Sequence, residues 1–390
     1  MTIFGVVAAI TFAACSGAPT PLYRVYQQDL GLSPFLLTVI FSAYVFSLLA
    51  ALLTVGSLSD YVGRRPVIFA ALALNAVAML MFIEAHSAAA LIAARIVQGL
   101  ATGAAITTLG AAILDTNRVR GALLNSITPF AGLTVGTLGS GALVAFAPDP
   151  TQLVYVVLLA VTALQAAVVW FMPETAESRP GAFASLRPHL SVPPQARASL
   201  LRVTPVNVAT WALGGFYFSL MPSLVRVATG LSSPFVGGVT VAALTFTATI
   251  AVVLVRERPA ARTLAAGTMT LVAGVVITLV GVRLQQVDLL LLGTVVAGFG
   301  FGATFSGTLR SVLPLASAGE RAGLLSTFYV ESYLAFSIPA ILVGLVAPLL
   351  GLPLSAYIYG SAVIVLALTS LMATRAMRKA DMPLIAASRR

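Results

Sequence analysis

Long apolar runs alternate with short polar segments along the whole chain. The length of each run is close to that of a membrane-spanning α-helix, which needs about 20 residues. Twelve such runs are present: 3–21, 35–55, 66–84, 88–114, 121–146, 152–172, 206–226, 234–255, 263–282, 287–312, 322–347 and 354–374. No Lys or Arg precedes the first run, which favours an ordinary first helix over a cleaved signal peptide. The pattern predicts an all-α integral membrane protein with twelve transmembrane helices.

One polar stretch, residues 173–205, is much longer than the others and holds six of the 21 prolines. Because proline lacks a backbone donor and stiffens a connection, we interpret this stretch as a linker. A short amphipathic helix near residues 195–203 is compatible with the pattern inside it. The predicted organisation is a six-helix bundle over 1–172, the linker over 173–205, a second six-helix bundle over 206–374 and a cytoplasmic tail over 375–390.

The two predicted halves also resemble each other in sequence. V-Q-G at 97–99 with G-A at 103–104 corresponds to V-A-G at 296–298 with G-A at 302–303, 199 residues later. R-G-A-L-L at 120–124 corresponds to R-A-G-L-L at 321–325, 201 residues later. Near-equal offsets on corresponding spans predict a duplicated six-helix unit.

Charge and hydropathy narrow the class of protein further. Charged residues make up 9% of the chain, against about 25% in soluble domains, and the mean hydropathy is +1.01. An ordinary soluble protein is therefore excluded. The net charge of +10 would suggest a nucleic-acid partner if the basic residues were clustered on a soluble surface.

The placement of the basic residues gives a different explanation for the net charge. Of the 22 Lys and Arg residues, Arg24, Arg226 and Arg283 fall on one side of the predicted membrane and Arg95 falls within a span. All the others follow even-numbered spans or lie in the tail, so the positive-inside rule places both termini in the cytoplasm. We expect no nucleic-acid partner. Lys379 is the sole lysine, which indicates a GC-rich bacterial genome and hence a bacterial cytoplasmic (inner) membrane.

The most informative segment is G-S-L-S-D-Y-V-G-R-R at residues 56–65, between two apolar runs. Glycines permit a tight turn, and the charges can hold other helix ends at the membrane surface. The segment resembles the signature loop of the major facilitator superfamily, G-x-x-x-D-x-x-G-R-R/K. Its fixed positions are Gly56, Asp60, Gly63, Arg64 and Arg65. This resemblance implies a secondary transporter whose two bundles rock around a central site.

The resemblance also implies a latch at the cytoplasmic face. In the family, an acidic residue at the end of span 4 joins the signature-loop charges, and Asp115 occupies that place. Asp60 also suits the positive N-terminal end of span 11, near Ala322 and Gly323. The alternative is that these charges only solvate loop ends and fix topology. The second half keeps only a degenerate loop, R-E-R-P at 256–259, which predicts asymmetric gating.

Glu331 is the one acidic residue that lies well inside a predicted span. It is roughly 13 Å from the start of span 11 at 1.5 Å per residue. An acidic side chain at the centre of a membrane helix costs about 2.5–3.5 kcal/mol on insertion scales, and desolvation favours its neutral form. We hypothesise that protonation of Glu331 alternates with substrate binding. The alternative is a protonated side chain hydrogen-bonded to Tyr329, Tyr333 or a neighbouring helix.

Arg95 is the second charge inside a span. R-I-V-Q-G at 95–99 resembles the family's R-x-x-x-G pattern, which implies a part in proton coupling. The i,i+3 spacing places Arg95 and Gln98 on one helix face. The alternative is an arginine that snorkels towards the outer leaflet. The first span lacks the acidic partner seen in drug:proton antiporters, and no contact between Arg95 and Glu331 is assumed.

Other residues give weaker indications of a substrate site. Span 5 carries Gly132, Gly136, Gly139 and Gly141, which partly resemble the family's antiporter motif but also suit close helix packing. The candidate cavity residues, whose alternative is lipid contact or gap filling, are Tyr44, Gln98, Trp211, Tyr217 and Tyr333.

No nucleotide-binding loop, metal-binding motif or hydrolase elbow is present in the sequence, so we expect no enzyme, cofactor or metal. We predict a monomeric transporter that moves a small organic molecule in exchange for protons, in the export direction. The alternatives are proton-coupled uptake of a sugar, organic acid or amino acid, and a membrane sensor that does not transport.

Overall fold

The computed structural model describes residues 1–188, 190–231, 233–317 and 319–387, and every regular element within them is a helix. The predicted all-α fold is therefore confirmed. The first half contains α1 (Thr2–Gly17), α2 (Pro19–Asp29), α3 (Pro34–Val55), α4 (Ser59–Val62), α5 (Arg64–Ile83), α6 (Ala88–Thr116), α7 (Gly121–Phe146), α8 (Pro150–Val168) and the 3₁₀ turn η1 (Val169–Phe171).

The second half follows a linker that carries one short helix, α9 (Ala182–Ser185). It contains α10 (Pro194–Ser219), α11 (Met221–Thr229), α12 (Pro234–Val255), α13 (Ala260–Leu284), α14 (Val287–Val312), η2 (Leu313–Leu315), α15 (Arg321–Leu350) and α16 (Leu352–Ala387). Eleven spans of the described residues are long and apolar enough to cross a membrane, and the bent pair α10–α11 makes a twelfth if it counts as one.

The first and seventh spans are both broken near the same end of the molecule. α1 gives way to α2 at Ala18, where Pro19 opens the new helix; Ala18 keeps helical backbone angles, so Thr2–Asp29 remains one span. α10 gives way to α11 at Leu220 with a bend of 67°. The two breaks lie 202 residues apart, which agrees with the offsets of the repeats in sequence. The duplication therefore extends to the backbone breaks.

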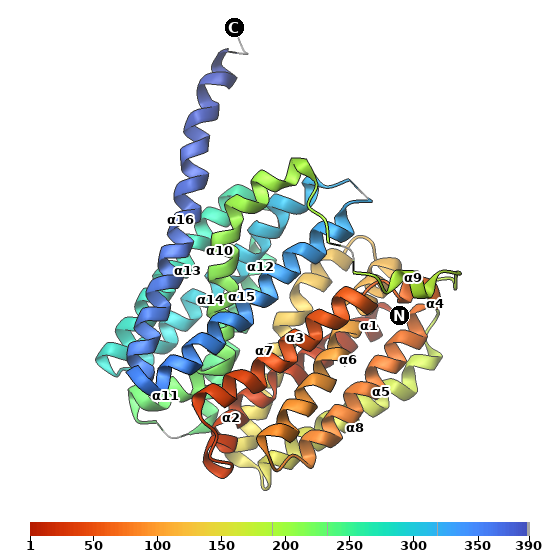
Figure 1. Cartoon of the computed structure of the whole chain (residues 1–390), viewed down its shortest axis with the longest axis vertical. Helices are drawn as coiled ribbons and strands as arrows, with labels where there is room; N and C mark the ends of the chain where they lie inside the picture. Colours follow the sequence, from red (N-terminus) through yellow and green to blue (C-terminus); the bar gives the residue numbers. More distant parts are fainter. Residues whose placement is uncertain (189, 232, 318, 388–390) are drawn as a thin grey trace.

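Two predicted boundaries were wrong. α10 begins at Pro194, inside the stretch taken as linker, so the short helix expected at 195–203 is the first part of α10 and Pro205 lies within it. A proline inside a long helix removes one backbone hydrogen bond, which membrane helices tolerate when neighbours compensate. α16 continues to Ala387 through most of the predicted tail and projects beyond the other helices (Figure 1). Residues 388–390 lie outside the described part.

Each half builds most of its own core. One cluster of buried residues draws on α10 to α16 and takes Phe130 from the first half. A second cluster draws on α1, α2, α3, α5, α6 and α8 and takes Phe218, Val241 and Ala340 from the second half. The halves also pack against each other, mainly through α7 with α12 and α3 with α15.

The helix ends define two ends of the molecule. The loops near residues 56–65, 116–120, 172–193, 256–259 and 313–320 lie at what we call the arginine-rich end, and the loops near 30–33, 84–87, 147–149, 230–233 and 285–286 lie at the arginine-poor end. In Figure 1, α4 and α9 mark the first end, and α2 and α11 mark the second.

Direct contact between the halves is close near the arginine-poor end. A Cβ placed on Gly344 of α15 would lie 2.3 Å from Oγ1 of Thr38 in α3, and one placed on Gly141 of α7 would lie 3.3 Å from Cα of Gly238 in α12. Small residues at these points let the backbones approach. The two halves are thus packed together at this end.

The glycines of α7 serve the same purpose. Cβ atoms on Gly132 and Gly136 would lie within 2.5 Å of backbone oxygens of Ile10 and Ala14 in α1. Gly139 has no such neighbour within 4 Å. These contacts favour the packing interpretation of the span 5 glycines.

Candidate functional site

The signature loop, residues 56–65, turns the chain between α3 and α5. Gly56 has ordinary helical backbone angles, whereas Gly63 has φ +98° and ψ 156°. This region of backbone space is essentially reserved for glycine, and other residues there cost about 1–3 kcal/mol. Gly63 is therefore the position at which the turn requires glycine, and it places Arg64 as the first residue of α5.

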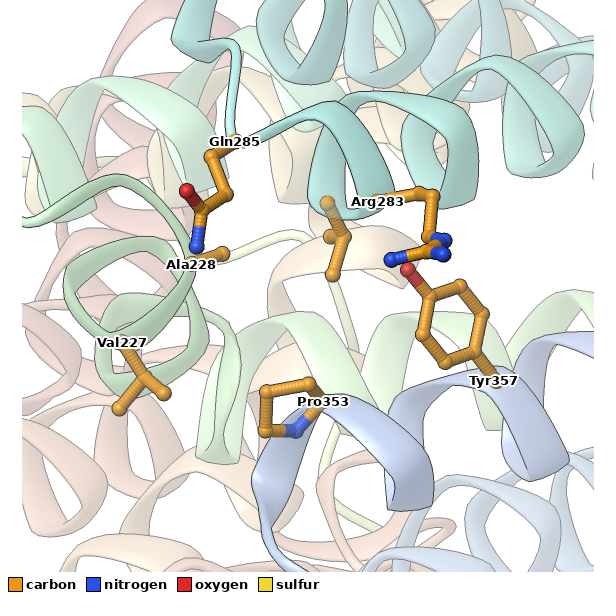
Figure 2. A pocket seen from close by; sticks show the side chains of 7 residues that line it. Val227, Ala228, Arg283, Gln285, Pro353 and Tyr357 are labelled. Carbon is orange, nitrogen blue, oxygen red and sulfur yellow. The ribbon is translucent and has the colours of Figure 1, made fainter.

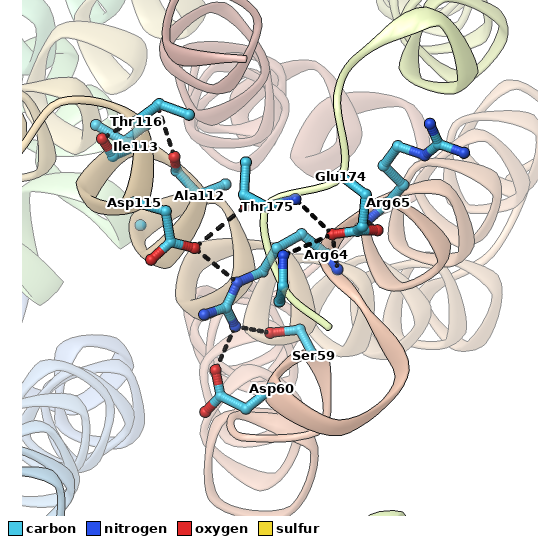
Figure 3. A network of polar contacts seen from close by, with 12 residues as sticks. Ser59, Asp60, Arg64, Arg65, Ala112, Ile113, Asp115, Thr116, Glu174 and Thr175 are labelled. Carbon is cyan, nitrogen blue, oxygen red and sulfur yellow. Dashed lines mark hydrogen bonds and ion pairs between the residues drawn. The ribbon is translucent and has the colours of Figure 1, made fainter. Parts of the chain in front are cut away.

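Arg64 is the centre of the polar network at the arginine-rich end (Figure 3). The residue is 8% exposed. Its Nε lies 3.2 Å from Oδ2 of Asp115, and its Nη1 lies 2.5 Å from Oδ1 of Asp60 and 2.7 Å from Oγ of Ser59. The predicted meeting of Arg64, Asp60 and Asp115 occurs. A buried guanidinium flanked by two carboxylates is charge-compensated and fixes α4, α5 and the end of α6 against one another.

Glu174 completes this network and was not singled out from the sequence. Its carboxylate accepts the backbone N–H of Arg64 at 2.8 Å and that of Arg65 at 2.9 Å. It thereby caps the N-terminus of α5, where unpaired N–H groups favour an anion. Partial burial raises the pKa of Glu174, but hydrogen bonds from the backbone of residues 64, 65, 175 and 176 outweigh it and hold the pKa below its usual range.

The only sequence signal for this cap was a carboxylate shortly after an even-numbered span. Its partner depends on how the linker folds back, which sequence spacing does not reveal. Thr175 continues the contact by donating its hydroxyl to Oδ2 of Asp115 at 3.2 Å. The linker therefore touches both α5 and α6.

Arg65 points to a different partner from Arg64. Its Nη1 donates to the carbonyl oxygen of Met172 at 2.9 Å, and its guanidinium lies 5.6 Å from the ring centroid of Trp170. Both contacts hold the end of α8 and η1 against α5, where an aromatic face stabilises a cation. The two adjacent arginines thus tie the loop to α6 and α8 separately.

Among the described residues, the hydrogen bonds and ion pairs of the signature loop stay within the first half and the linker. Asp60 is bonded by Arg64, and the first turn of α15 is instead approached by the linker and by the start of α10. The N–H of Ser191 donates to the carbonyl oxygen of Gly323 at 3.4 Å, and Nε2 of Gln195 donates to Glu320 at 3.0 Å. In this conformation, therefore, the predicted contact of Asp60 with α15 is not made.

Arg95 lies in a buried pocket of neutral acceptors and is 1% exposed. It donates from Nη1 to the carbonyl oxygen of Ser16 at 3.0 Å and to Oε1 of Gln98 at 2.7 Å, and from Nε to the Tyr23 hydroxyl at 3.2 Å. Its guanidinium also lies 5.0 Å from the centroid of the Tyr44 ring. Arg95 therefore faces the protein interior in this conformation and does not snorkel towards the outer leaflet.

Gln98 holds Arg95 in place, and no carboxylate among the described residues pairs with it. Gln98 is fully buried and donates from Nε2 to the carbonyl oxygen of Cys15 at 2.8 Å, so its two ends link α6 to α1. The ion pairs of the described residues involve only Arg64 and Arg256 as cations. The positive charge of Arg95 is therefore met by dipoles and ring faces, without a carboxylate partner in the described structure.

Glu331 lies in the second half, between α15 and α10, and is half-buried. The Thr204 hydroxyl donates to Oε2 at 2.8 Å and the Asn207 amide donates to Oε1 at 2.9 Å. Asn207 also donates to Oγ of Ser332 at 3.1 Å. A neighbouring helix supplies the partners, as one alternative from the sequence foresaw, and neither Thr204 nor Asn207 was identified from the sequence.

The aromatic candidates separate into two groups. Trp211 contacts Tyr333 with ring centroids 5.4 Å apart and Phe336 with centroids 5.7 Å apart, and its indole N–H is buried without a partner. Phe336 in turn contacts Phe41 of the first half at 5.0 Å. These rings span the junction of the two halves.

Tyr217 belongs elsewhere. It is 2% exposed, and its hydroxyl lies 2.9 Å from Oγ1 of Thr294 and 3.5 Å from Oγ1 of Thr278, within the helices of the second half. These contacts account for the residue as part of that core, and the structure does not bring it to the other candidates.

A separate hollow of about 300 Å³ opens at the arginine-poor end of the second half. Its wall includes Val227 of α11, Arg283 near the end of α13, Gln285 and Tyr357 of α16, and Figure 2 shows the Arg283 guanidinium beside the Tyr357 hydroxyl. None of the candidate cavity residues lines it. This hollow is distinct from the junction occupied by Trp211 and Tyr333.

The fold and these sites define a polytopic helical membrane protein of two repeated halves. The family model of the Major Facilitator Superfamily matches residues 5–282. The chain belongs to this superfamily and is a secondary transporter, not an enzyme, which confirms the class inferred from the sequence.

Among curated proteins, the chain is similar to the multidrug resistance protein MdtL of Klebsiella pneumoniae. The two are 32% identical over 117 residues, which cover 29% of this chain and 30% of the relative. The matched stretch thus spans less than a third of that protein's length.

Solved structures share the fold over nearly the whole chain. The human organic anion transporter MFSD10 (TETRAN) aligns with a TM-score of 0.68 at 18% identity, covering 95% of this chain and 98% of that one. A bacterial homolog of the human lysosomal transporter Spinster, in an inward-facing and unoccupied conformation, aligns with a TM-score of 0.77 at 13% identity, covering 97% of each chain.

Proposed function

We propose that the chain exports a small organic molecule across the bacterial cytoplasmic membrane in exchange for protons, with Glu331 as the proton carrier. The arginine-rich end faces the cytoplasm in this proposal, as the positive-inside rule predicts, and the protein works as a monomer. The name of the relative MdtL, a multidrug resistance protein, supports the export direction. The division into halves of six spans supports rocking about a central site.

The hydrogen bonding of Glu331 is the observation that carries the proton role. Thr204 is within reach of two acceptors, because its hydroxyl lies 2.8 Å from Oε2 of Glu331 and 3.0 Å from the carbonyl oxygen of Leu200. A hydroxyl donates once and accepts as well. When Glu331 is ionised, Thr204 donates to it. When Glu331 is protonated, it donates to Thr204, which then donates to Leu200. Both protonation states are satisfied without movement of the backbone.

Arg95 bears on the kind of cargo. A buried guanidinium with no carboxylate partner in the described structure creates a positive potential near the junction of the halves. A cationic group placed there would be repelled, whereas a neutral or acidic group would be tolerated or attracted. The same positive charge is the basis for a proposed role of Arg95 in coupling. Trp211, Tyr333 and Tyr44 supply aromatic faces for an organic molecule beside it.

The signature-loop network supports a gate at the cytoplasmic end. Asp60, Arg64 and Asp115 lie in one network, and Gly63 sets the turn that carries them. We propose that Asp60 reaches the first turn of α15 when the arginine-rich end closes. The bond of Asp60 to Arg64 then belongs to the conformation in which the halves meet at the other end.

The test is coupled flux in liposomes that contain the purified full chain and a trapped pH dye. The panel comprises lipophilic cations, sugars, amino acids and organic acids. We expect substrate-dependent proton movement, at least tenfold reduced in Glu331→Gln and unchanged in the control Glu257→Gln, whose carboxylate is exposed and pairs with its neighbour Arg256. The sign of the proton movement separates export by antiport from uptake by symport.

Two outcomes would contradict parts of this proposal. Substrate flux without a proton signal would leave a transporter that is not driven by protons. A proton signal that survives in Glu331→Gln would assign the carrier elsewhere and leave Glu331 a structural role. Binding of a ligand without flux in any direction would favour the sensor alternative.

A further inference from the structure

Arg24 and Arg226 occupy equivalent positions in the two halves. Each follows a helix break by six residues, Arg24 after Ala18 in α2 and Arg226 after Leu220 in α11. L-Y-R-V at 22–25 corresponds to L-V-R-V at 224–227, 202 residues later. The repeat therefore provides one arginine from each half at the arginine-poor end.

The two arginines lie on helix faces that meet. Gln27 is three residues beyond Arg24 in α2, and Ser223 is three residues before Arg226 in α11, so each pair shares a helix face. The Ser223 hydroxyl donates to Oε1 of Gln27 at 3.3 Å across the junction of the halves. This bond brings the faces of α2 and α11 that carry Arg24 and Arg226 towards each other.

Neither guanidinium is neutralised by the described residues. The Nε atoms of Arg24 and Arg226 are both buried without a hydrogen-bond partner. The ion pairs of the described structure involve neither arginine, although Asp29 and Asp149 lie at the same end. Two like charges brought together with unpaired donors repel each other and favour separation of α2 from α11.

We propose that Arg24 and Arg226 form an anion-binding site between the two halves, which takes a carboxylate or phosphate group. Guanidinium groups bind these anions in bidentate geometry. One anion between the two arginines would replace repulsion by two attractions and supply acceptors for the buried Nε atoms. Anion binding therefore stabilises the conformation in which the halves meet at the arginine-poor end. The site depends neither on proton coupling nor on the direction of transport.

Inorganic phosphate is the first probe, titrated against purified full-length protein in detergent at matched ionic strength with chloride as the reference. We expect a saturable rise in the midpoint of thermal unfolding. The rise should be lost in Arg24→Gln and in Arg226→Gln and kept in Arg283→Gln. Arg283 is the matched control, because it is an exposed arginine at the same end that lines the separate hollow of Figure 2.

Arg24→Glu gives a second, independent readout. It converts the like pair into an opposite pair, so the midpoint without phosphate should exceed that of Arg24→Gln, and the response to phosphate should vanish. A response that survives in both single Gln variants would overturn the proposal. So would a response lost only in Arg283→Gln, which would move the site to the hollow between α11, α13 and α16.

A lipid headgroup is the other source of the same chemistry. The same variants in nanodiscs of phosphatidylglycerol or phosphatidylcholine distinguish the two sources. Stabilisation by phosphatidylglycerol that requires Arg24 and Arg226, with no effect of free phosphate, would identify a lipid as the bound anion. No dependence on either anion would refute the site. These measurements need no transport, so their failure is separate from failure of the flux experiment.

Discussion

The corresponding loops of the two halves at the arginine-rich end are held by opposite arrangements. In the first half, the loop between α3 and α5 supplies the arginine, and the end of α6 supplies the acceptor: Arg64 donates to Asp115. In the second half, the arginine is at the end of α14, and Arg310 donates to the carbonyl oxygen of Val255 at 2.9 Å and to that of Arg258. The acidic residue of the second loop, Glu257, pairs on the surface with Arg256 instead.

This difference shows which loop is suited to switching. The first loop relies on buried charge, a glycine with positive φ and a carboxylate from the linker, so its stability depends on ionisation and on the position of the linker. The second relies on bonds to backbone carbonyls and on an exposed pair, and surface pairs contribute about 0–1 kcal/mol. Duplication therefore kept the hairpin and changed the way it is fixed.

The largest expected difference between the two loops is the loss of stability when the arginine of each is replaced. Arg64→Gln leaves Asp60 and Asp115 without their shared cation, and we expect a loss of about 2–3 kcal/mol of stability. Arg310→Gln removes bonds to neutral carbonyls and should cost about 1–2 kcal/mol. The measurement is the midpoint of thermal unfolding of both variants in the same detergent. An equal or larger loss for Arg310→Gln would mean that the second loop is no less dependent on its arginine.

Gly63→Ala tests the backbone contribution alone. The positive φ should cost about 1–3 kcal/mol, and the added Cβ would lie 2.9 Å from Oε2 of Glu174. The control is Gly139→Ala in α7, where a Cβ meets nothing within 4 Å and alanine favours the helix by about 1 kcal/mol. Thermal unfolding should show opposite shifts. Tolerance of alanine at position 63 would contradict a strict glycine requirement.

The smallest expected effect is the pH dependence from Glu174. Because its pKa is lowered in the folded state, its contribution to stability is complete above the ordinary glutamate pKa of about 4.3. The contribution is lost as the pH falls through the lowered value. Glu174→Gln should therefore flatten the acid side of the curve of unfolding midpoint against pH. Glu177→Gln, a linker carboxylate without those four backbone donors, should leave the curve unchanged; identical curves for both variants would refute the cap.

The helical spans, the signature loop and Glu331 could be predicted because each is recognised from residues close together in the sequence. The length of each apolar run fixed the approximate spans, and the signature loop with Asp115 gave the first-half network before its geometry was known. Glu331 was found because a carboxylate deep in an apolar span is costly. The start of α10 was misplaced because the six prolines of 173–205 suggested a break, whereas Pro194 opens a helix and Pro205 is accommodated inside it.

The chain by itself determined the class of protein, the number of spans and the residues whose chemistry is out of place in a membrane, because hydrophobicity and spacing act through neighbours along the helix. The tertiary structure decided the partners. Glu174 caps α5, Asn207 and Thr204 bind Glu331, and Ser223 binds Gln27, in each case across more than a hundred residues of sequence. Such pairings depend on how two repeated halves pack and how the linker returns, and no local pattern encodes that geometry.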